Sequence, residues 1–437
     1  MLFILFASNG IGVFSQDNML ITPAQMKEDT DFYFKTLYEI HPNPYYYYSS
    51  MEFEHMRSSI YTRINKAMTY EQFAWILGEV NAYVDAHSVL NFYPCMDKRG
   101  LFDGLNKKNR VFPNIRIKDG RVYLKENGLE IEKINERSVA DIIEEERKYF
   151  NMKLPYEQNI HKMEEFFPIF INSKYDIVSP FKVKFKGEEE VKLVEGYTVE
   201  RYLRESADGI RGWDIGHKYP YRIYPFSSVA IFSITDFLGQ SEEVLMKDLD
   251  DFIKLVNDYK IRNVFYDLTK NEGGSFHTLH SAAKALDVIR HGSVSLRYVK
   301  VDDFDDSIKG KQRINEVVLH PNTNMGIPEG RKLYVLQGVN TLSTGDYFCR
   351  MVSENKLGIL VGQNTGEPTV AFSCTQGNYA TPNSKIPFTI ATALLDFSEY
   401  FDTETLHPDV YWDVNNNLEF TEMELIKIVE HCKTIKR

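Results

Sequence analysis

Ser343 is the residue whose position best suits nucleophilic chemistry. It follows an apolar stretch that ends at Leu336, and it precedes a predicted helix with an apolar face made of Tyr347, Phe348, Met351 and Val352. A serine in this position is most often only an N-cap. The same position also suits a nucleophile, because the helix dipole and the next backbone N–H stabilise developing negative charge.

A glycine pair, Gly273-Gly274, forms a second junction of this kind. It follows the apolar stretch Tyr266–Leu268 and precedes another predicted helix. Glycines allow backbone N–H groups to approach a ligand without an intervening Cβ atom, and beside a helix N-terminus such groups can bind the oxyanion of acyl transfer. An ordinary tight turn would use the same residues, so the glycine pair alone does not decide between these interpretations.

Together the two junctions resemble the motifs of the tail-specific (C-terminal processing) serine peptidases, which include the tricorn-core proteins. The first family motif, Asp-Leu-Arg-x-Asn-x-Gly-Gly, is similar to residues 267–274, with Thr269 in place of the arginine. The second motif begins with Thr-x-Ser and continues later with Val/Ile-Gly-Glu-x-Thr-Gly. Residues 341–346 and 361–366 resemble these two parts.

The resemblance implies a role for each matching residue. Ser343 is expected to be the nucleophile, and the amides of Gly273 and Thr344 are expected to bind the oxyanion. Asn271 and Gly274 are expected to contribute to substrate binding.

The resemblance also implies that His87 is the general base. The tricorn-like branch uses a histidine from the N-terminal region in an Asp-x-His-Thr/Ser context, which residues 85–88 match. Histidine suits this role near neutral pH when it reaches the hydroxyl. The bacterial processing branch instead uses a lysine at the position that Pro368 occupies here, which disfavours a Ser-Lys dyad.

A third residue would orient the imidazole and stabilise its cation. In the family, a glutamate precedes a Gly-x-Gly-x-Pro-Asp turn near the C-terminus. The register of residues 402–409 places Asp402 at that position, and Glu404 is the alternative.

Hydrophobic periodicity divides the chain into successive regions. Residues 16–109 are predicted to be a helical N-terminal region that carries His87, and residues 110–205 a small β-rich module. Residues 206–437 are predicted to be an α/β catalytic core with a largely parallel sheet, because apolar strand-like runs alternate there with amphipathic helices. The resemblance implies a core of the crotonase/Clp-like type, and residues 128–143 are loosely similar to PDZ modules, which bind carboxylates.

Two local predictions within the N-terminal region concern the setting of His87. Thr69 and Gln72 have the spacing of a capping box, so a helix should begin there and end near Asp85. A strand is predicted for Val89–Tyr93, which places His87 at a helix-to-strand junction.

The composition excludes some classes of function. The net charge is −11 and the sequence has no basic stripe, which argues against nucleic-acid binding. His277 and His280 lie three residues apart, but no carboxylate spacing completes a metal site with them. The four cysteines are scattered, so buried single thiols are expected, with one disulfide in an oxidising compartment as the alternative. No metal or organic cofactor is needed.

Residues 1–15 are predicted to be a signal peptide. An apolar run, Leu2–Ala7, precedes Val13 and Ser15, which stand at the −3 and −1 positions of a small-residue cleavage site, although no basic residue precedes the run. An apolar tail is the alternative. The run is too short to span a bilayer, and no later stretch is long enough. The sequence therefore predicts a secreted or periplasmic protein without a membrane span.

The expected reaction is hydrolysis of peptide bonds in peptides or unfolded proteins through an acyl-enzyme on Ser343. The alternative is a non-catalytic protein that binds ligands or peptides on the same fold, because Thr269, Glu367 and the turn after Asp402 depart from the family pattern. An esterase with the same triad is a further alternative, since ester and amide hydrolysis share one oxyanion intermediate.

Overall fold

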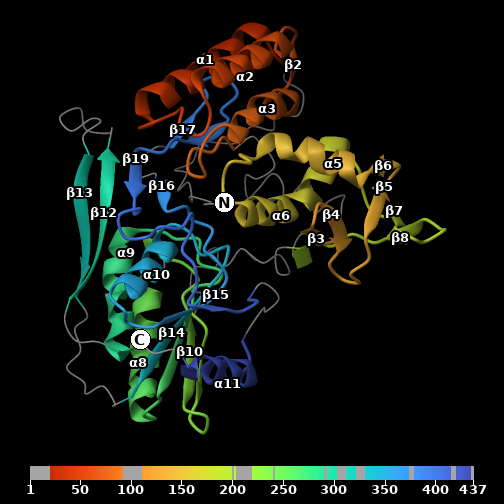
Figure 1. Ribbon diagram of the computed structural model, residues 1–437. Helices are drawn as coiled ribbons and strands as arrows, with labels where there is room; N and C mark the ends of the chain where they lie inside the picture. Colours follow the sequence, from red (N-terminus) through yellow and green to blue (C-terminus); the bar gives the residue numbers. More distant parts are fainter. Residues whose placement is uncertain are drawn as a thin grey trace. The chain divides into compact units, whose positions relative to one another are not determined.

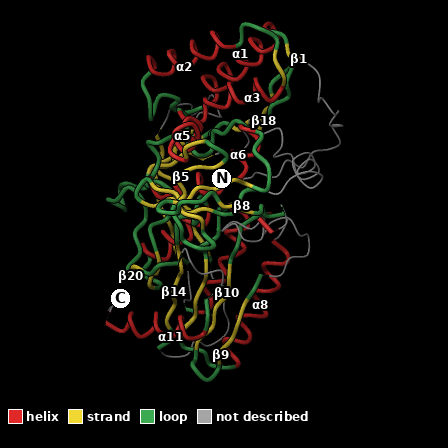
Figure 2. Tube along the Cα trace, turned by 90° about the vertical axis from the view of Figure 1, so that its right-hand side faces the viewer, coloured by secondary structure: helices red, strands yellow, loops and turns green. Residues whose placement is uncertain are grey.

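The computed structural model describes most of the chain, in two compact units (Figures 1 and 2). The first unit comprises Met1–Ser206, Val301–Gln312 and Phe372–Leu394, and the second comprises Ala207–Lys300, Arg313–Ala371 and Leu395–Arg437. The described residues are 20–91, 111–198, 201–202, 219–239, 242–289, 293–302, 312–320, 330–373, 378–414 and 420–434. The predicted signal peptide lies outside them.

Helices form the amino-terminal part of the first unit. They are α1 (Pro23–Ile40), α2 (Ser50–Arg63) and α3 (Tyr70–Gly78), and a 3-10 turn (Glu79–Ala82) follows α3. Each of the three begins with a reciprocal capping box, which satisfies N–H groups at the helix start. The capping box predicted at Thr69 and Gln72 is confirmed. Just before α1 and α3, β1 (Leu20–Ile21) pairs with β2 (Met68–Thr69).

The predicted strand Val89–Tyr93 is wrong for the residues that the structure describes. Leu90 forms only an isolated bridge with Phe388. The backbone N–H and C=O of Leu90 are instead hydrogen-bonded by the side-chain amide of Asn81, at 2.8 and 2.9 Å. Asn81 therefore satisfies the backbone groups of Leu90, while the segment pairs with its neighbour through the Asn91 N–H, which donates to the Pro387 carbonyl at 2.8 Å, and the Val89 carbonyl, which accepts the Thr389 N–H at 2.9 Å.

The region 110–205, predicted to be β-rich, also contains substantial helix. β3 (Ile115–Lys118) pairs with β4 (Arg121–Leu124), and a separate sheet has the order β6-β5-β7-β8. Its strands are β5 (Ile131–Ile134), β6 (Arg137–Ser138), β7 (Phe181–Phe185) and β8 (Lys192–Val194). The helices are α5 (Val139–Glu146) and the 20-residue α6 (Tyr156–Tyr175). The sequence prediction missed α6, which contains Pro168, a residue that usually interrupts helices.

A six-stranded sheet forms the centre of the second unit. Its order is β20-β15-β14-β11-β10-β9, and every pair is parallel except β10 with β9. The strands are β9 (Tyr221–Tyr224), β10 (Val229–Ser233), β11 (Asn263–Asp267), β14 (Lys332–Gln337), β15 (Ile359–Gly362) and β20 (Val410–Tyr411). The predicted α/β core with a largely parallel sheet is confirmed.

Helices cover both faces of this sheet, and Figure 1 shows α8 (Glu242–Asp258) and α11 (Glu422–His431) on opposite sides of β10 and β14. Successive strand residues point to opposite faces. Phe265 and Tyr334 belong to the cluster that contains Leu425 of α11, whereas Tyr266 contacts Phe252 of α8. Burial on both faces explains why the strands are continuously apolar.

The remaining described strands form two smaller sheets. One has the order β13-β12-β19-β16, from β12 (Val294–Asp302), β13 (Gln312–Leu319), β16 (Val370–Ser373) and β19 (Ala393–Asp396). The other pairs β17 (Asn378–Ala380) with β18 (Pro387–Thr389).

Among the described residues, no helix is long and apolar enough to cross a membrane. Cys349 and Cys432 are free, buried thiols, as the sequence favours, and Cys95 and Cys374 lie outside the described residues.

The end of β15 provides a test of the packing. Gly362 has a φ of 134°, and a Cβ atom there would lie 2.0 Å from the Gln337 carbonyl oxygen. Gly362→Ala should therefore lower the free energy of unfolding by about 2–4 kcal/mol through strain and overpacking. Gly330→Ala is the matched control, because Gly330 also has a positive φ but open space around it. The control should cost about 1 kcal/mol. Equal losses in urea unfolding would contradict the assigned packing.

Candidate active site

Two loops meet at the carboxyl ends of adjacent strands in the second unit. β11 and β14 are parallel neighbours, with Asp267 opposite Leu336, so the loops that follow them start at the same sheet edge. The N–H of Leu342 donates to the carbonyl of Asn271 at 2.9 Å, and the Thr341 hydroxyl donates to the carbonyl of Leu268 at 2.8 Å. These bonds hold the glycine loop against the turn that carries Ser343.

Ser343 occupies a strained turn at the start of α10 (Thr344–Glu354). Its φ is 48° and its ψ −123°, a combination that residues with a Cβ atom rarely adopt, and its hydroxyl makes no capping hydrogen bond. The N-cap interpretation therefore fails. The predicted buried face of the helix is confirmed, because Tyr347, Phe348, Met351 and Val352 are all buried. The turn presents a serine whose hydroxyl is not used for structure.

The glycine pair allows the loop to approach this turn closely. A Cβ atom at Gly273 would lie 2.7 Å from the Cβ of Ser343 and 2.9 Å from the N of Thr344. A Cβ at Gly274 would lie 2.3 Å from the backbone of Phe237. Only glycine fits at either position, and the space beside the Thr344 amide stays open as a result.

The amides that could bind an oxyanion differ from the sequence expectation. The Gly273 N–H, expected to be a donor, instead donates to Oδ1 of Asn271 at 2.8 Å, as in an Asx turn. The N–H groups of Thr344 and Gly274 donate to no acceptor among the described residues. The Gly273 carbonyl accepts from Phe237, so in a trans peptide the Gly274 N–H points away from Phe237. The carbonyl of Gly274 accepts from the Thr344 hydroxyl.

Asn271 has a structural role instead of the predicted contact with substrate. Its side chain is fully buried. Nδ2 donates to the Ile234 carbonyl at 2.9 Å, while Oδ1 accepts the Gly273 N–H. Both polar ends are used within the protein, so the residue shapes the glycine loop.

A buried polar network behind Ser343 was not predicted from the sequence. Oε2 of Glu367, a residue that is 2% exposed, accepts the backbone N–H of Ser343 at 3.1 Å. One helical turn after Ser343, Asp346 forms a fully buried ion pair with Arg350 at 2.5 Å and accepts the Thr365 hydroxyl at 2.7 Å. Burial raises the pKa of Asp346 to about 6, Arg350 acts in the opposite direction, and the nearby Glu367 carboxylate adds to the rise.

The two candidate acids lie on an exposed segment of the second unit. Asp402 and Glu404 are both exposed, and no described residue of that unit hydrogen-bonds either carboxylate. The segment's backbone is fixed next to the Glu367 loop, because Thr369 donates its N–H to the Glu404 carbonyl at 2.7 Å and its hydroxyl to the Thr403 carbonyl.

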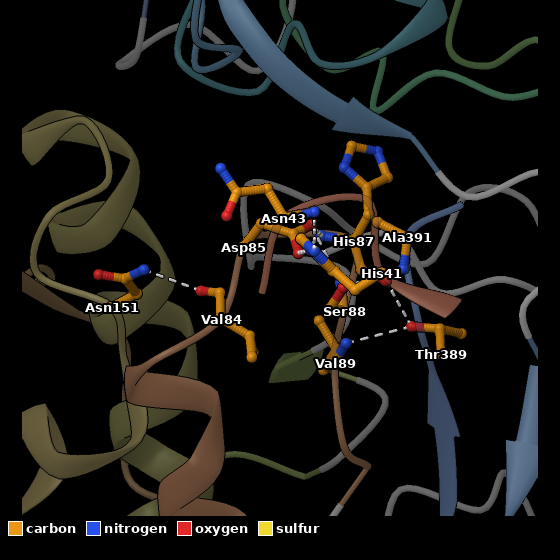
Figure 3. A network of polar contacts seen from close by, with 10 residues as sticks. All are labelled: His41, Asn43, Val84, Asp85, His87, Ser88, Val89, Asn151, Thr389 and Ala391. Atoms are coloured by element: carbon orange, nitrogen blue, oxygen red, sulfur yellow. Dashed lines mark hydrogen bonds and ion pairs between the residues drawn. The ribbon is translucent and has the colours of Figure 1, made fainter. Parts of the chain in front are cut away.

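His87 lies in a tightly bonded turn of the first unit. Asp85 Oδ1 accepts the N–H groups of His87 and Ser88 at 2.7 and 3.1 Å. The Thr389 hydroxyl donates to the His87 carbonyl at 2.6 Å, and the Ala391 N–H donates to the Ser88 hydroxyl at 2.9 Å. Figure 3 shows these contacts, with the His87 ring pointing away from the Asp85 carboxylate. No described residue of this unit hydrogen-bonds either ring nitrogen.

A second histidine fixes the other side of the Asp85 carboxylate. Nε2 of His41 lies 2.9 Å from Oδ2 of Asp85, and Nδ1 of His41 accepts the Asn43 N–H at 3.0 Å (Figure 3). Because Nδ1 accepts a hydrogen bond, Nε2 must carry the ring proton and donate a hydrogen bond to Asp85. Burial is the largest single effect on the pKa of Asp85 and raises it, but the hydrogen bond and charge of His41, with smaller effects of His87 and Ser88, together lower the pKa to about 2.

The charge state of His87 follows from its surroundings. Burial lowers the pKa of His87 to about 4, although the Asp85 carboxylate acts in the opposite direction. The imidazole is therefore neutral at pH 7, which is the state that a general base requires.

No metal centre is evident in the described part of the chain. No group of three or more His, Cys, Asp or Glu side chains there could hold a metal ion. Nδ1 of His280 lies 2.7 Å from the Phe276 carbonyl oxygen, and the His277 side chain is 82% exposed.

The comparisons with known proteins agree with this geometry. Residues 228–412 match the family described as peptidase family S41. The chain therefore carries an S41 domain, and it is a serine-type peptidase that hydrolyses peptide bonds. The resemblance to the tail-specific serine peptidases is confirmed.

Solved structures show the same fold. The structure described as mature CPAF aligns with a TM-score of 0.60 and 12% identity, over 94% of this chain and 95% of that chain. Mature CPAF complexed with lactacystin aligns with a TM-score of 0.57 and 11% identity, over 89% and 94%. No curated protein matches the sequence. At these identities the likeness concerns the fold, which mixes α and β elements as predicted.

The lowered pKa of His87 predicts a pH dependence of stability. In the unfolded chain this histidine would titrate near pH 6.5. As the pH falls from about 6.5 to 4, the unfolded chain binds a proton that the folded protein does not, so the free energy of unfolding should decrease across this window. In urea unfolding, wild type should lose more stability between pH 7 and pH 5 than His87→Gln.

An NMR titration of the histidine rings is the direct check. The His87 signal, assigned by its absence in His87→Gln, should titrate near pH 4. Asp85→Asn should lower the midpoint further, because it removes the negative charge that favours the protonated ring. A His87 midpoint at or above pH 6.5 would contradict the burial of this ring.

Proposed function

We propose that the peptidase acts through an acyl-enzyme on Ser343, with His87 as general base and Asp402 as the carboxylate that orients it. The Ser343 Oγ attacks the substrate carbonyl carbon while His87 takes the hydroxyl proton. The tetrahedral oxyanion collapses, the C–N bond breaks, and His87 protonates the leaving amine. His87 then takes a proton from a water molecule, whose oxygen attacks the ester carbon. The bond from that carbon to the Ser343 Oγ breaks, and His87 returns the proton to Oγ.

The observation that carries this proposal is the backbone of Ser343. A non-glycine residue at φ 48° and ψ −123° costs about 1–3 kcal/mol and persists where the surroundings enforce it, which is common at active sites. Here that strain presents a hydroxyl with no capping role at a helix N-terminus. A nucleophile needs this arrangement, whereas a structural serine gains nothing from it.

We propose that the amides of Thr344 and Gly274 bind the oxyanion. Both are free of acceptors among the described residues, and the Thr344 hydroxyl binds the Gly274 carbonyl at 2.8 Å, which keeps the two residues together. Gly273 contributes through its missing side chain, because a Cβ there would lie 2.9 Å from the Thr344 nitrogen.

The general base is assigned to His87 because its ring is neutral and its nitrogens have no partner in its own unit. The Asp85 bonds fix the backbone beneath the ring, so the imidazole is presented from a rigid turn. Asp402 is the proposed orienting carboxylate from the register of residues 402–409, with Glu404 as the alternative. Both carboxylates are exposed and available for a partner.

The proposed substrates are peptides and unfolded chains, held in part by residues 110–205 acting as a PDZ-like module. A cavity of about 640 Å³ lies between β4, β5 and α5, and Arg121, Lys133 and Arg147 contribute to its lining. A slot between a strand and a helix suits an extended chain. Glu130, Glu132 and Glu144 also line it, and Glu130 and Glu144 pair with Arg121 and Arg147 at 3.8 and 3.3 Å.

We also propose that the protein is secreted or periplasmic, and that residues 1–15 form its signal peptide. The apolar run and the small residues Val13 and Ser15 support this. Amino-terminal sequencing of protein recovered from the periplasm or medium should give a chain that begins at Gln16. A recovered chain that retains residues 1–15 would contradict the proposal.

The triad assignment is tested by cleavage of a denatured protein and a peptide library, read by mass spectrometry. Ser343→Ala and His87→Ala should each lower kcat by at least about 10³-fold with folding intact, because the triad acts as a unit. No cleavage by wild type would favour the non-catalytic binding protein. Cleavage that survives in Ser343→Ala would place the nucleophile elsewhere.

The same assay separates the two candidate acids. Asp402→Asn should lower kcat by several orders of magnitude, because the imidazole loses its orientation and the imidazolium its counter-charge. Glu404→Gln is the matched control and should change kcat less than about threefold. The reverse pattern would assign the acid to Glu404.

A further inference from the structure

The carboxylate of Glu367 is placed where a nucleophile's backbone can use it. The side chain is 2% exposed, and its Oε2 accepts the N–H of Ser343 at 3.1 Å. Glu367 is 24 residues from Ser343 in the sequence, so this bond closes a long loop and is not a local capping interaction. Burying a carboxylate is costly unless its charge is used in hydrogen bonds or ion pairs.

Close backbone packing brings Glu367 to this position. A Cβ atom at Gly366 would lie 2.1 Å from the carbonyl oxygen of Val339 and 2.7 Å from Cδ2 of Leu342. The loop therefore lies directly against the segment that leads into Ser343. On its other side the loop is held by the Thr365 N–H, which donates to the Leu406 carbonyl at 3.1 Å.

The hydrogen bond has two consequences for Ser343. It gives the backbone N–H of Ser343 an acceptor at the strained turn. The residues just before Ser343 form no helix or strand that would supply one. It also engages the Ser343 N–H, which leaves the amide of Thr344, one residue later, as the donor on this side of the oxyanion site.

The surrounding charges are compatible with a carboxylate there. Asp346 and Arg350 form a fully buried ion pair at 2.5 Å, and Glu367 lies near enough to Asp346 to raise its pKa. Arg350 also donates to the Thr369 hydroxyl at 3.3 Å, two residues after Glu367. One guanidinium therefore stabilises the region in which both carboxyl groups are buried.

We propose that Glu367 is a positioning residue for the nucleophile: its side-chain oxygen accepts the Ser343 N–H and so holds the strained turn in its reactive conformation. The inference rests on the proposed function of Ser343. The hydrogen-bond acceptor is the essential feature, so an amide oxygen at the same reach serves the same purpose.

Peptide cleavage kinetics and the rate at which a fluorophosphonate probe acylates Ser343 test this role. Glu367→Ala should lower kcat and the acylation rate about 10- to 100-fold, as expected for a buried amide left without its acceptor, while KM changes little. Glu367→Gln should stay within about fivefold of wild type. Glu367→Asp keeps the charge but withdraws the acceptor by one methylene, and it should behave like Glu367→Ala.

Asp248→Ala is the matched control. Asp248 is also buried, and its Oδ2 accepts the Tyr219 N–H at 2.7 Å, but it lies on α8. This variant should lose thermal stability and retain kcat, which separates positioning from general destabilisation.

Hydrogen exchange provides a readout that does not depend on activity. The Ser343 amide should be protected in wild type and Glu367→Gln and should exchange faster in Glu367→Ala and Glu367→Asp. A wild type that fails to cleave peptides but shows this pattern would refute the proposed function and support the positioning bond. Equal activity of all variants, equal loss in Glu367→Gln and Glu367→Ala, or unchanged exchange would overturn the inference.

Discussion

The strained backbone of Ser343 is the constraint on which the candidate site depends. A residue with a Cβ atom stays at φ 48° only where its surroundings over-determine it. Here the surroundings are backbone: Gly273 approaches the turn from the β11 loop, and Gly366 approaches the segment before it from the β15 loop. Because β11, β14 and β15 are parallel neighbours, these loops begin at one sheet edge and can meet there.

The segment that supports the nucleophile also continues toward the base. Glu367 accepts the Ser343 N–H, and about twenty residues later Thr389 and Ala391 hydrogen-bond the turn that holds His87. The chain then returns to the second unit and reaches Asp402. Residues 367–402 thus hydrogen-bond the backbone of Ser343, hydrogen-bond the turn that holds His87, and end at Asp402. His87 itself is more than 250 residues before Ser343 in the sequence.

Much of this architecture could be predicted from local pattern. The apolar runs at β10, β11, β14 and β15 and the amphipathic pattern of α8 identify the parallel sheet, because periodicity reports burial directly. Glycines and a serine at strand ends identify the site, because few other residues fit such turns. The capping box at Thr69 is similarly local and was predicted correctly.

What could not be predicted depends on contacts between distant residues or on competing hydrogen bonds. Glu367 follows a glycine in a loop, where no periodicity marks it as buried. His41 pairs with Asp85 across 44 residues, which no local spacing reveals. The motif predicts that the Gly273 N–H binds the oxyanion, but Oδ1 of Asn271, two residues earlier, accepts this N–H. Asn81 likewise accepts the backbone N–H of Leu90, nine residues later in the chain.

A crystal structure with a peptide aldehyde bound tests the assignment of Ser343 most directly. A covalent bond from the Ser343 Oγ to the aldehyde carbon is expected. The resulting oxygen should accept hydrogen bonds from the amides of Thr344 and Gly274, with the His87 ring within hydrogen-bond reach of the Ser343 Oγ. An aldehyde attached to another residue, or bound without a covalent bond to Ser343, would show that Ser343 is not the nucleophile.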